Sequence, residues 1–201
     1  MNVATHGLGF LMSIVGGIYL FQLALTAPFE WGMMAATVFI LSMCVLYFAS
    51  TVYHWYSWQK GKDHFRLKMF DHIAIYFLIA GTYTPFTLLL LEGLSARIIF
   101  SGVWGLAILG TLFKLKFGDA YPWISLVLYL LMGWLIIIDI GQLIELGTLF
   151  TLSFLLAGGI SYTLGTIFYV NKSWKYHHPV WHLFVIGGTT SHFVSICSLY
   201  F

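Results

Sequence analysis

Seven long apolar runs constrain this 201-residue chain more than any other feature of its sequence. A helix needs ~20 mainly apolar residues to cross the hydrocarbon core of a bilayer, and seven segments meet that requirement. Charged residues make up only 8% of the chain, whereas a soluble protein has roughly 25%. We therefore predict an all-α integral membrane protein, a single domain over residues 1–201 that forms a seven-transmembrane-helix bundle. The predicted spans are residues 7–27, 33–56, 70–91, 96–116, 122–141, 148–170 and 180–200.

The same pattern excludes two other classes of protein. The strands of a membrane β-barrel are ~10 residues long and alternate in polarity, and no such alternation occurs here. The formal net charge is only +2 and the few charges are not clustered, so we expect no nucleic-acid partner. The expected partner is the membrane lipid.

The basic residues predict the orientation of the bundle. Three connectors, between spans two and three, four and five, and six and seven, share one side of the membrane. They carry eight of the nine Lys and Arg residues, namely Lys60, Lys62, Arg66, Lys68, Lys114, Lys116, Lys172 and Lys175. The positive-inside rule then puts the N-terminus in the cytoplasm and the C-terminus outside.

Four side chains that can bind a metal or carry a proton fall at the same end of these spans. His54 lies at the end of the second apolar run, Asp71 at the start of the third, and His178 and His182 at the start of the last. In an alternating bundle, all four lie at one depth near the cytoplasmic face. Polar groups at that depth are costly without a partner, which indicates a metal site or a proton path.

The histidines have the spacing of a metal site. His178 and His182 are four positions apart, so they project from one helical face, and Pro179 between them is compatible with a first helical turn. With His54 from another helix, three imidazoles leave one position of a tetrahedral zinc ion open for water, as in catalytic zinc sites. Imidazole also binds copper, nickel and iron, but redox-inactive zinc is the first choice. We predict His54, His178 and His182 as ligands of Zn²⁺.

Two further residues complete the predicted catalytic site. Asp71 can accept a hydrogen bond from the attacking water or from a ligand histidine, and can take up the proton of that water. Ser50 lies one turn before His54 on the same helical face and can bond the substrate or the water. Each group also has a structural interpretation, as an interfacial aromatic for a histidine or as a charge favoured at a helix N-terminus for Asp71. The convergence of four groups on one face favours the functional interpretation.

The remaining polar groups are given structural interpretations. His72 and His177 are neighbours of the predicted site residues, but their direction or spacing is unsuitable. His64 lies among basic residues and is expected to be solvated. His192 and Asp139 lie deeper in the spans, where we expect them to line an inner polar cavity or to pair with neighbouring hydroxyl groups.

Three motifs occur in a characteristic order. Ser50-Thr-Val-Tyr-His54 fits an S-x-x-x-H motif, and His178-Pro-Val-Trp-His182 fits an H-x-x-x-H motif. Between them, Asp71-His72 followed by Ile79-Ala-Gly-Thr-Tyr-Thr-Pro85-Phe86 is similar to a third-helix signature. Over essentially its whole length the chain resembles the hemolysin III family, the bacterial branch of the progestin and adipoQ receptor superfamily. The family's opening E-x-x-N-x-x-x-H motif is half present as Asn2-Val-Ala-Thr-His6, without the Glu.

The resemblance implies a seven-helix bundle in a bacterial inner membrane. It also implies zinc held by His54, His178 and His182, with Asp71 and Ser50 in supporting or catalytic roles. Eukaryotic members of the superfamily are hormone receptors, and more distant relatives are alkaline ceramidases with similar zinc chemistry.

Three classes of function therefore stay open. The first is a zinc-dependent hydrolase of an amide or ester bond in a lipid that enters sideways from the bilayer. The second is a membrane sensor or receptor-like protein with a structural zinc, which acts through a separate cytoplasmic partner. The third is a pore-forming, haemolytic or transport protein. Against the third, only Asp139 and His192 are polar groups deep in the spans, which is sparse for an ion path.

The predicted orientation can be tested with reporter fusions. Fusions at Glu92 and Lys116 should report opposite sides of the membrane, with Lys116 in the cytoplasm, because the basic connectors stay inside. A periplasmic signal at Lys116 would overturn the cytoplasmic position of the site.

Overall fold

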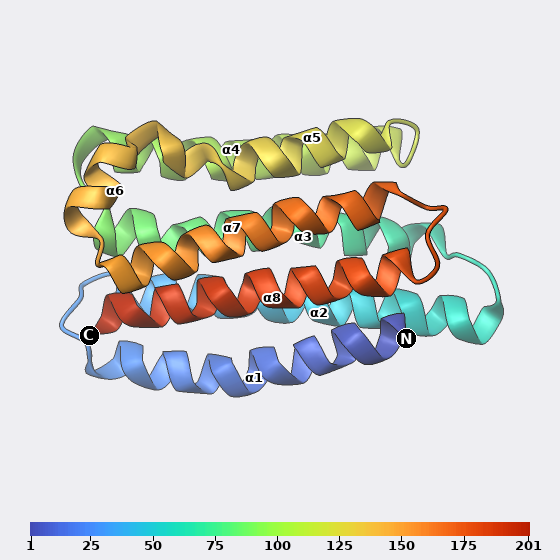
Figure 1. The fold of residues 1–201 in the computed structure, drawn as a ribbon, viewed down its shortest axis with the longest axis horizontal. Coiled ribbons are helices and arrows are strands. Elements are labelled where there is room, and N and C mark those ends of the chain that lie inside the picture. Colours follow the sequence, from blue (N-terminus) through green and yellow to red (C-terminus); the bar gives the residue numbers. More distant parts are fainter.

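Seven membrane-spanning helical segments make up the fold (Figure 1). The computed structural model describes all residues 1–201. Seven segments are long and apolar enough to cross a membrane, which confirms the predicted class of fold. The elements are α1 (Asn2–Thr26), α2 (Gly32–Lys60), α3 (Phe65–Pro85), the π-helix η1 (Phe86–Leu90), α4 (Gly93–Phe117), α5 (Pro122–Gly133), the 3₁₀ helix η2 (Leu135–Asp139), α6 (Ile140–Leu146), α7 (Leu149–Val170), α8 (His177–Cys197) and the 3₁₀ helix η3 (Ser198–Tyr200).

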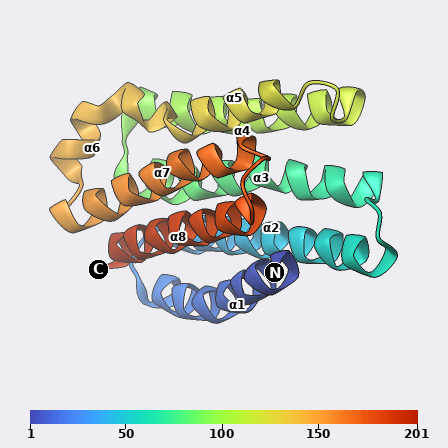
Figure 2. The same cartoon turned by 45° about the vertical axis from the view of Figure 1, so that its right-hand side comes forward.

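The helices pack against neighbours in a fixed order. α1 packs on α2 and α8, α2 packs on α3, α3 packs on α4 and α5, and α7 packs on α8. Figures 1 and 2 show α1 at one side of the bundle and α4 with α5 at the other side. Connectors 61–64, 118–121 and 171–176 lie at one end, and the N-terminus lies toward the same end. We call this the basic end.

Several helices extend beyond the predicted spans. α1 begins at Asn2 rather than at residue 7, and α3 begins at Phe65 rather than at residue 70. The fifth span continues to Leu146 rather than to residue 141. Hydropathy marks only the part of a helix that lies in hydrocarbon, whereas helical hydrogen bonding continues past it. The early start of α1 places an additional helical turn beside the site described below.

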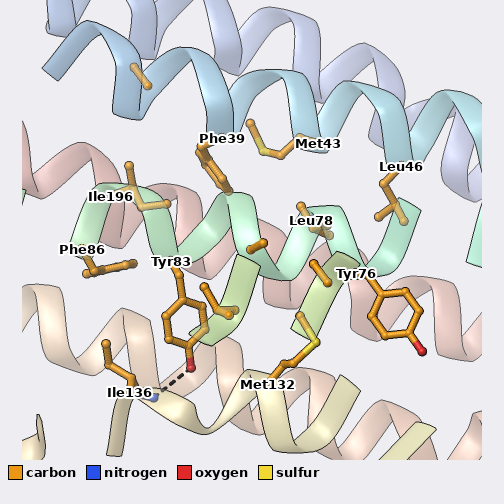
Figure 3. Packing of buried hydrophobic residues seen from close by; sticks show 14 of the residues in the cluster. Phe39, Met43, Leu46, Tyr76, Leu78, Tyr83, Phe86, Met132, Ile136 and Ile196 are labelled. Atoms are coloured by element: carbon orange, nitrogen blue, oxygen red, sulfur yellow. Dashed lines mark hydrogen bonds between the residues drawn. The ribbon is translucent and has the colours of Figure 1, made fainter. Parts of the chain in front are cut away.

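The fifth span is interrupted near its centre, next to a hydroxyl group from α3. The Tyr83 hydroxyl donates to the carbonyl of Gly133 (3.0 Å) and accepts from the N–H of Ile136 (2.9 Å), the bond drawn in Figure 3. Asp139 accepts a 3.4 Å hydrogen bond from a backbone N–H in the first turn of α6. Backbone groups that lose their helical partners must be satisfied inside the protein because lipid offers none. Tyr83 and Asp139 supply those partners.

The surface and the interior have the polarity expected of a protein in lipid. Large apolar side chains cover the outside, and Val15, Leu109 and Ile138 are each more than 60% exposed. The interior holds the aromatic and aliphatic cluster shown in Figure 3, with Phe39 and Tyr76 fully buried. An outside so apolar would be unfavourable in water, so it indicates lipid contact.

Glycine allows α7 and α8 to approach closely. A Cβ atom on Gly158 would overlap the ring of His192, and one on Gly188 would overlap the ring of Tyr162. Small residues let membrane helices pack at short distance, which is their usual role in lipid.

An ion-pair cluster joins the α4–α5 connector to α3 at the basic end. Lys114 Nζ lies 2.7 Å from Asp119 Oδ1, and Lys68 Nζ lies 2.8 Å from Asp119 Oδ2. His72 Nδ1 lies 3.5 Å from Asp119 Oδ1. The hydrogen bond from His72, followed by those from Lys114 and Lys68, holds the pKa of the Asp119 carboxyl well below its usual range, although burial acts in the opposite direction. Lys114, which was counted with the connector between spans four and five, lies in the last turn of α4, and its side chain is only 2% exposed.

We predict that Asp119→Asn destabilises the protein by on the order of 2 kcal/mol, because the buried Lys114 ammonium loses its partner. Folding lowers the pKa of Asp119, so its stabilising contribution is present above the unfolded-state pKa of ~4 and is lost as the pH falls below that value. The melting temperature of the wild type in detergent should therefore drop more steeply with acidification than that of the variant.

Asp63→Asn is the matched control. Its carboxylate is 59% exposed and 3.8 Å from Lys68, so its loss should change the melting temperature little. Equal melting of Asp119→Asn and wild type would contradict the anchoring role of Asp119.

Candidate metal centre

The structure brings the three predicted histidines together near the basic end. His54 lies in the last turns of α2, and His178 and His182 lie in the first two turns of α8. Nε2 of His54 and Nε2 of His178 are 3.2 Å apart. The centroids of the three rings are separated by 5.0, 4.9 and 4.6 Å. One ligand nitrogen from each residue lies within 4.8 Å of the others.

The start of α8 sets the direction of two of these rings. Tyr176 has a left-handed backbone conformation (φ 63°), and the helix begins directly after it at His177. Pro179 lies in the first turn, as predicted, where its missing N–H costs no hydrogen bond. His178 and His182 therefore share one helical face and point toward α2.

The arrangement fits a tetrahedral metal ion. Nitrogens bound at roughly 2.0–2.1 Å to zinc are ~3.3 Å apart in a tetrahedral site, and the His54 and His178 nitrogens are separated by 3.2 Å. Nδ1 of His182 is hydrogen-bonded to Thr5, which leaves Nε2 of His182 for a metal. The cluster can hold one ion of the class that imidazole binds.

Asp71 and Ser50 line a small cavity beside these histidines. The cavity has a volume of about 30 Å³, and its walls include His178 and His182. Asp71 is 8% exposed and Ser50 is 1% exposed, and Ser50 Oγ has no hydrogen-bond partner within the protein. A water molecule needs roughly 10–15 Å³ of such space, so the cavity can hold one between the carboxylate, the hydroxyl and the imidazoles.

A larger polar cavity connects this region to the basic end. Its volume is about 650 Å³, and its walls include His54, Asp71, His178, Lys68 and Asp119. Asp71 and His178 line both cavities, so the site lies where the large cavity meets the small one.

The other histidines near the basic end have structural partners. His72 contacts the Asp119 carboxylate, and Nδ1 of His177 lies 3.2 Å from the carbonyl of Phe168. His64 was expected to be solvated, but its Nδ1 accepts a 3.4 Å hydrogen bond from the backbone of α3 and caps that helix. A side chain at this position has unpaired helical N–H groups within reach, which its sequence surroundings do not reveal.

The two deeper polar residues have different roles. His192 lines two inner cavities, and its Nε2 lies 3.1 Å from the carbonyl of Leu155. Asp139 lines neither of these cavities and pairs with no hydroxyl group, contrary to expectation. It caps α6 instead, because the break in the fifth span leaves backbone N–H groups that need an acceptor.

Two residues of α1 that were not predicted as part of the site lie against His182. Thr5 Oγ1 is 2.9 Å from His182 Nδ1. The His6 ring stacks on the His182 ring, with centroids 3.5 Å apart and planes inclined by 14°. His6 is 4% exposed, and neither of its ring nitrogens has a partner. The half-motif Asn2-Val-Ala-Thr-His6 was the available signal for these residues.

Comparison with known proteins decides the family. The sequence pattern described as "Haemolysin-III related" matches residues 1–193. This chain belongs to the haemolysin-III related family. It is 42% identical to a hemolysin-3 homolog of Bacillus subtilis (strain 168), with 100% of this chain and 92% of that protein covered. It is 40% identical to hemolysin-3 of Bacillus cereus, with 100% and 90% covered.

The similarity extends to a human protein. Monocyte to macrophage differentiation factor of Homo sapiens is 29% identical, with 97% of this chain and 81% of that protein covered. The bacterial and human matches together confirm the family resemblance that the three motifs indicated.

We predict that His182→Ala abolishes stoichiometric metal binding, because two imidazoles rarely retain the ion. Elemental mass spectrometry should find about one metal ion per wild-type chain, as expected of a single three-histidine site. His177→Ala is the control, since His177 bonds to a backbone carbonyl outside the cluster. Full occupancy in His182→Ala, or equal loss in both variants, would show that the ligand set is wrong.

Proposed function

We propose that this protein is a zinc-dependent hydrolase that cleaves an amide or ester bond of a membrane lipid. The position of the histidine cluster carries the proposal. The cluster lies between a polar cavity at the basic end and apolar cavities that continue into the bundle. A lipid carbonyl and a water molecule can meet only where apolar and polar spaces join.

We infer from their shared walls that the apolar cavities together form a passage from the cluster toward the lipid-facing surface. The 30 Å³ cavity adjoins an apolar cavity of about 90 Å³. The residues that line both are Leu46, Ile75, Trp181 and Val185. The second cavity shares Tyr83, Trp134 and His192 with a third cavity of about 250 Å³.

The third cavity reaches side chains that face the bilayer. Ile137, Ile144 and Leu156 line it, and these side chains are 51%, 62% and 53% exposed. They come from the fifth span and from α7, so the opening lies between these two segments. An acyl chain can enter there from hydrocarbon and remain in an apolar environment while its carbonyl reaches the cluster.

The donor set favours zinc. Three neutral imidazoles bind first-row metals, and three protein ligands with a fourth position open is the pattern of catalytic zinc sites. When bound there, zinc acts as a Lewis acid on the lipid carbonyl and lowers the pKa of water toward ~7.

The protein's own residues supply the remaining chemistry. The Asp71 carboxylate accepts the proton of the attacking water and can deliver it to the leaving group. The Ser50 hydroxyl, which has no partner within the protein, donates a hydrogen bond to the oxygen on which negative charge develops. Both groups line the water-sized cavity, and Asp71 also lines the large polar cavity through which water can reach it.

The position of the site suits a bond at headgroup level. Under the positive-inside rule, the basic end of the bundle faces the cytoplasm. Water then arrives through the 650 Å³ cavity from the cytoplasm. The acyl chain stays in the apolar passage on the opposite side of the cluster.

A membrane sensor with a structural zinc is the second candidate. The cluster joins α2 to α8, and the Tyr47 hydroxyl of α2 also donates to Thr189 of α8 (2.9 Å). An ion held by His54, His178 and His182 would lock these two helices in one arrangement. A separate cytoplasmic partner would then detect that arrangement.

A pore-forming or transport function has less support. Hemolysin-3 of Bacillus cereus is named for haemolysis. In this chain, the two inner cavities are lined mainly by apolar residues, and His192 bonds to a backbone carbonyl. An ion path needs a continuous row of polar groups.

We predict that Asp71→Asn lowers lipid turnover by ~10²–10⁴-fold, because Asn keeps the shape of Asp but cannot accept a proton. Zinc content should stay unchanged. The measurement is mass spectrometry of bacterial lipid extracts incubated with each purified protein, with the released fatty acid as the product.

Asp139→Asn is the matched control. It makes the same substitution in the same bundle, but at the cap of α6, where Asn is also a good capping residue. Its turnover should equal that of the wild type. If the wild type changes no lipid, or Asp71→Asn turns lipid over equally fast, the hydrolase proposal fails and the sensor proposal leads.

A further inference from the structure

The first turn of α1 makes a specific contact with one of the three clustered histidines. Thr5 Oγ1 lies 2.9 Å from Nδ1 of His182, between residues 177 positions apart in the sequence. Thr5 itself is neither one of the three clustered histidines nor part of the Asp71 and Ser50 pair. It comes from a helix that contributes no predicted ligand.

The direction of this hydrogen bond follows from counting protons. A threonine hydroxyl has one proton to donate. Thr5 Oγ1 also lies 2.9 Å from the carbonyl oxygen of Asn2 and 3.4 Å from that of Met1, and a carbonyl can only accept. Both contacts can be hydrogen bonds at the same time only if the Thr5 proton goes to a backbone carbonyl of its own helix and Nδ1 of His182 is the donor. The lone pairs of Thr5 are left to accept a proton from His182.

This direction selects one form of the His182 ring. If Nδ1 donates to Thr5, the proton of the neutral imidazole is on Nδ1, and the lone pair is on Nε2. A metal binds the nitrogen that carries the lone pair. Metal-binding histidines commonly have such a partner on the other ring nitrogen, which fixes the tautomer and the orientation of the ring.

We propose that Thr5 is a positioning residue for His182, which holds the ring in the Nδ1–H tautomer and aims Nε2 at the metal. This inference rests on the metal site of the proposed function but is independent of any hydrolase activity. Thr5 touches neither the metal nor the substrate. It acts only through the ring of His182.

His6 supports the same orientation from the face of the ring. Its imidazole stacks on His182 at 3.5 Å, and it also makes a T-shaped contact with the ring of Tyr47, with centroids 5.2 Å apart. Consecutive residues of α1 thus restrain His182 at its edge and at its face. The position of α1 and the geometry of the metal site are therefore linked.

The test compares zinc affinity in three variants of the full chain. Thr5→Val removes the hydroxyl but keeps the branched shape, and should raise the zinc dissociation constant ~10–100-fold, the usual effect of losing such a partner. Thr5→Ser keeps the hydroxyl and should remain within threefold of the wild type. The dissociation constants are measured in detergent by competition with a chromogenic zinc chelator.

Thr51→Val is the matched control. Thr51 Oγ1 donates to a backbone carbonyl one turn earlier in α2 (2.7 Å), so it has the local geometry of Thr5 without a histidine partner. Its zinc affinity should match that of the wild type. Thermal melting of the metal-free proteins checks that they are folded. The metal-free forms of all three variants should have the same melting temperature as the metal-free wild type.

Nitrogen NMR of histidine-labelled protein gives a second readout without metal. In the metal-free wild type at pH 8, His182 should be in the Nδ1–H form, and Thr5→Val should show a mixture of both tautomers. An Nε2–H form in the wild type, or unchanged zinc affinity in a folded Thr5→Val protein, would overturn the role of Thr5. If the wild type binds zinc and Thr5→Val binds it weakly but no lipid is cleaved, the hydrolase proposal fails while the role of Thr5 stands.

Discussion

A polar group left unpaired in hydrocarbon costs several kcal/mol, and the rest of this structure depends on that constraint. Of the 157 backbone–backbone hydrogen bonds, 139 lie within helices, so most backbone N–H and C=O groups of the spans are paired within their own helix. Where the fifth span is interrupted near its centre, the Tyr83 hydroxyl bonds both the carbonyl of Gly133 and the N–H of Ile136. The buried Lys114 is held by Asp119 for the same reason.

The histidine cluster meets the same requirement, that buried polar groups have partners, in a different way. A neutral imidazole can bind a metal without bringing a charge of its own into a region of low dielectric constant. Beside the cluster, Ser50 Oγ and both ring nitrogens of His6 are buried without a protein partner. The charged groups of the region, Lys68 and Asp119, lie in the wall of the large cavity at the basic end, while the walls beyond the cluster are apolar. The proposed hydrolysis of a lipid depends on this separation of polar and apolar space.

Much of the site was predictable because it rests on local patterns. The four-residue spacing of His178 and His182 defines a helical face in any structure, and the alternation of spans brings His54 to the same depth. Thr5 and His6 were missed because hydropathy sets the start of the first apolar run at residue 7, whereas α1 begins at Asn2. Asp139 was misjudged because the break in the fifth span has no proline or paired glycine to signal it, and depends on the Tyr83 hydroxyl from α3. The zinc, the reaction and the cytoplasmic face remain predictions.

The sequence by itself determined the seven helical spans, the segregation of basic residues and the identity of the clustered histidines. These properties depend on hydropathy and helical periodicity, which are carried by residues close together along the chain. The tertiary structure alone decided the contact between Thr5 and His182, the burial of Lys114 on Asp119 and the placement of the apolar cavities that share walls beyond the cluster. These features depend on how side chains of distant helices pack, because a hydrogen bond or a cavity wall requires atoms to be placed within a few tenths of an ångström. Sequence distance carries no such information.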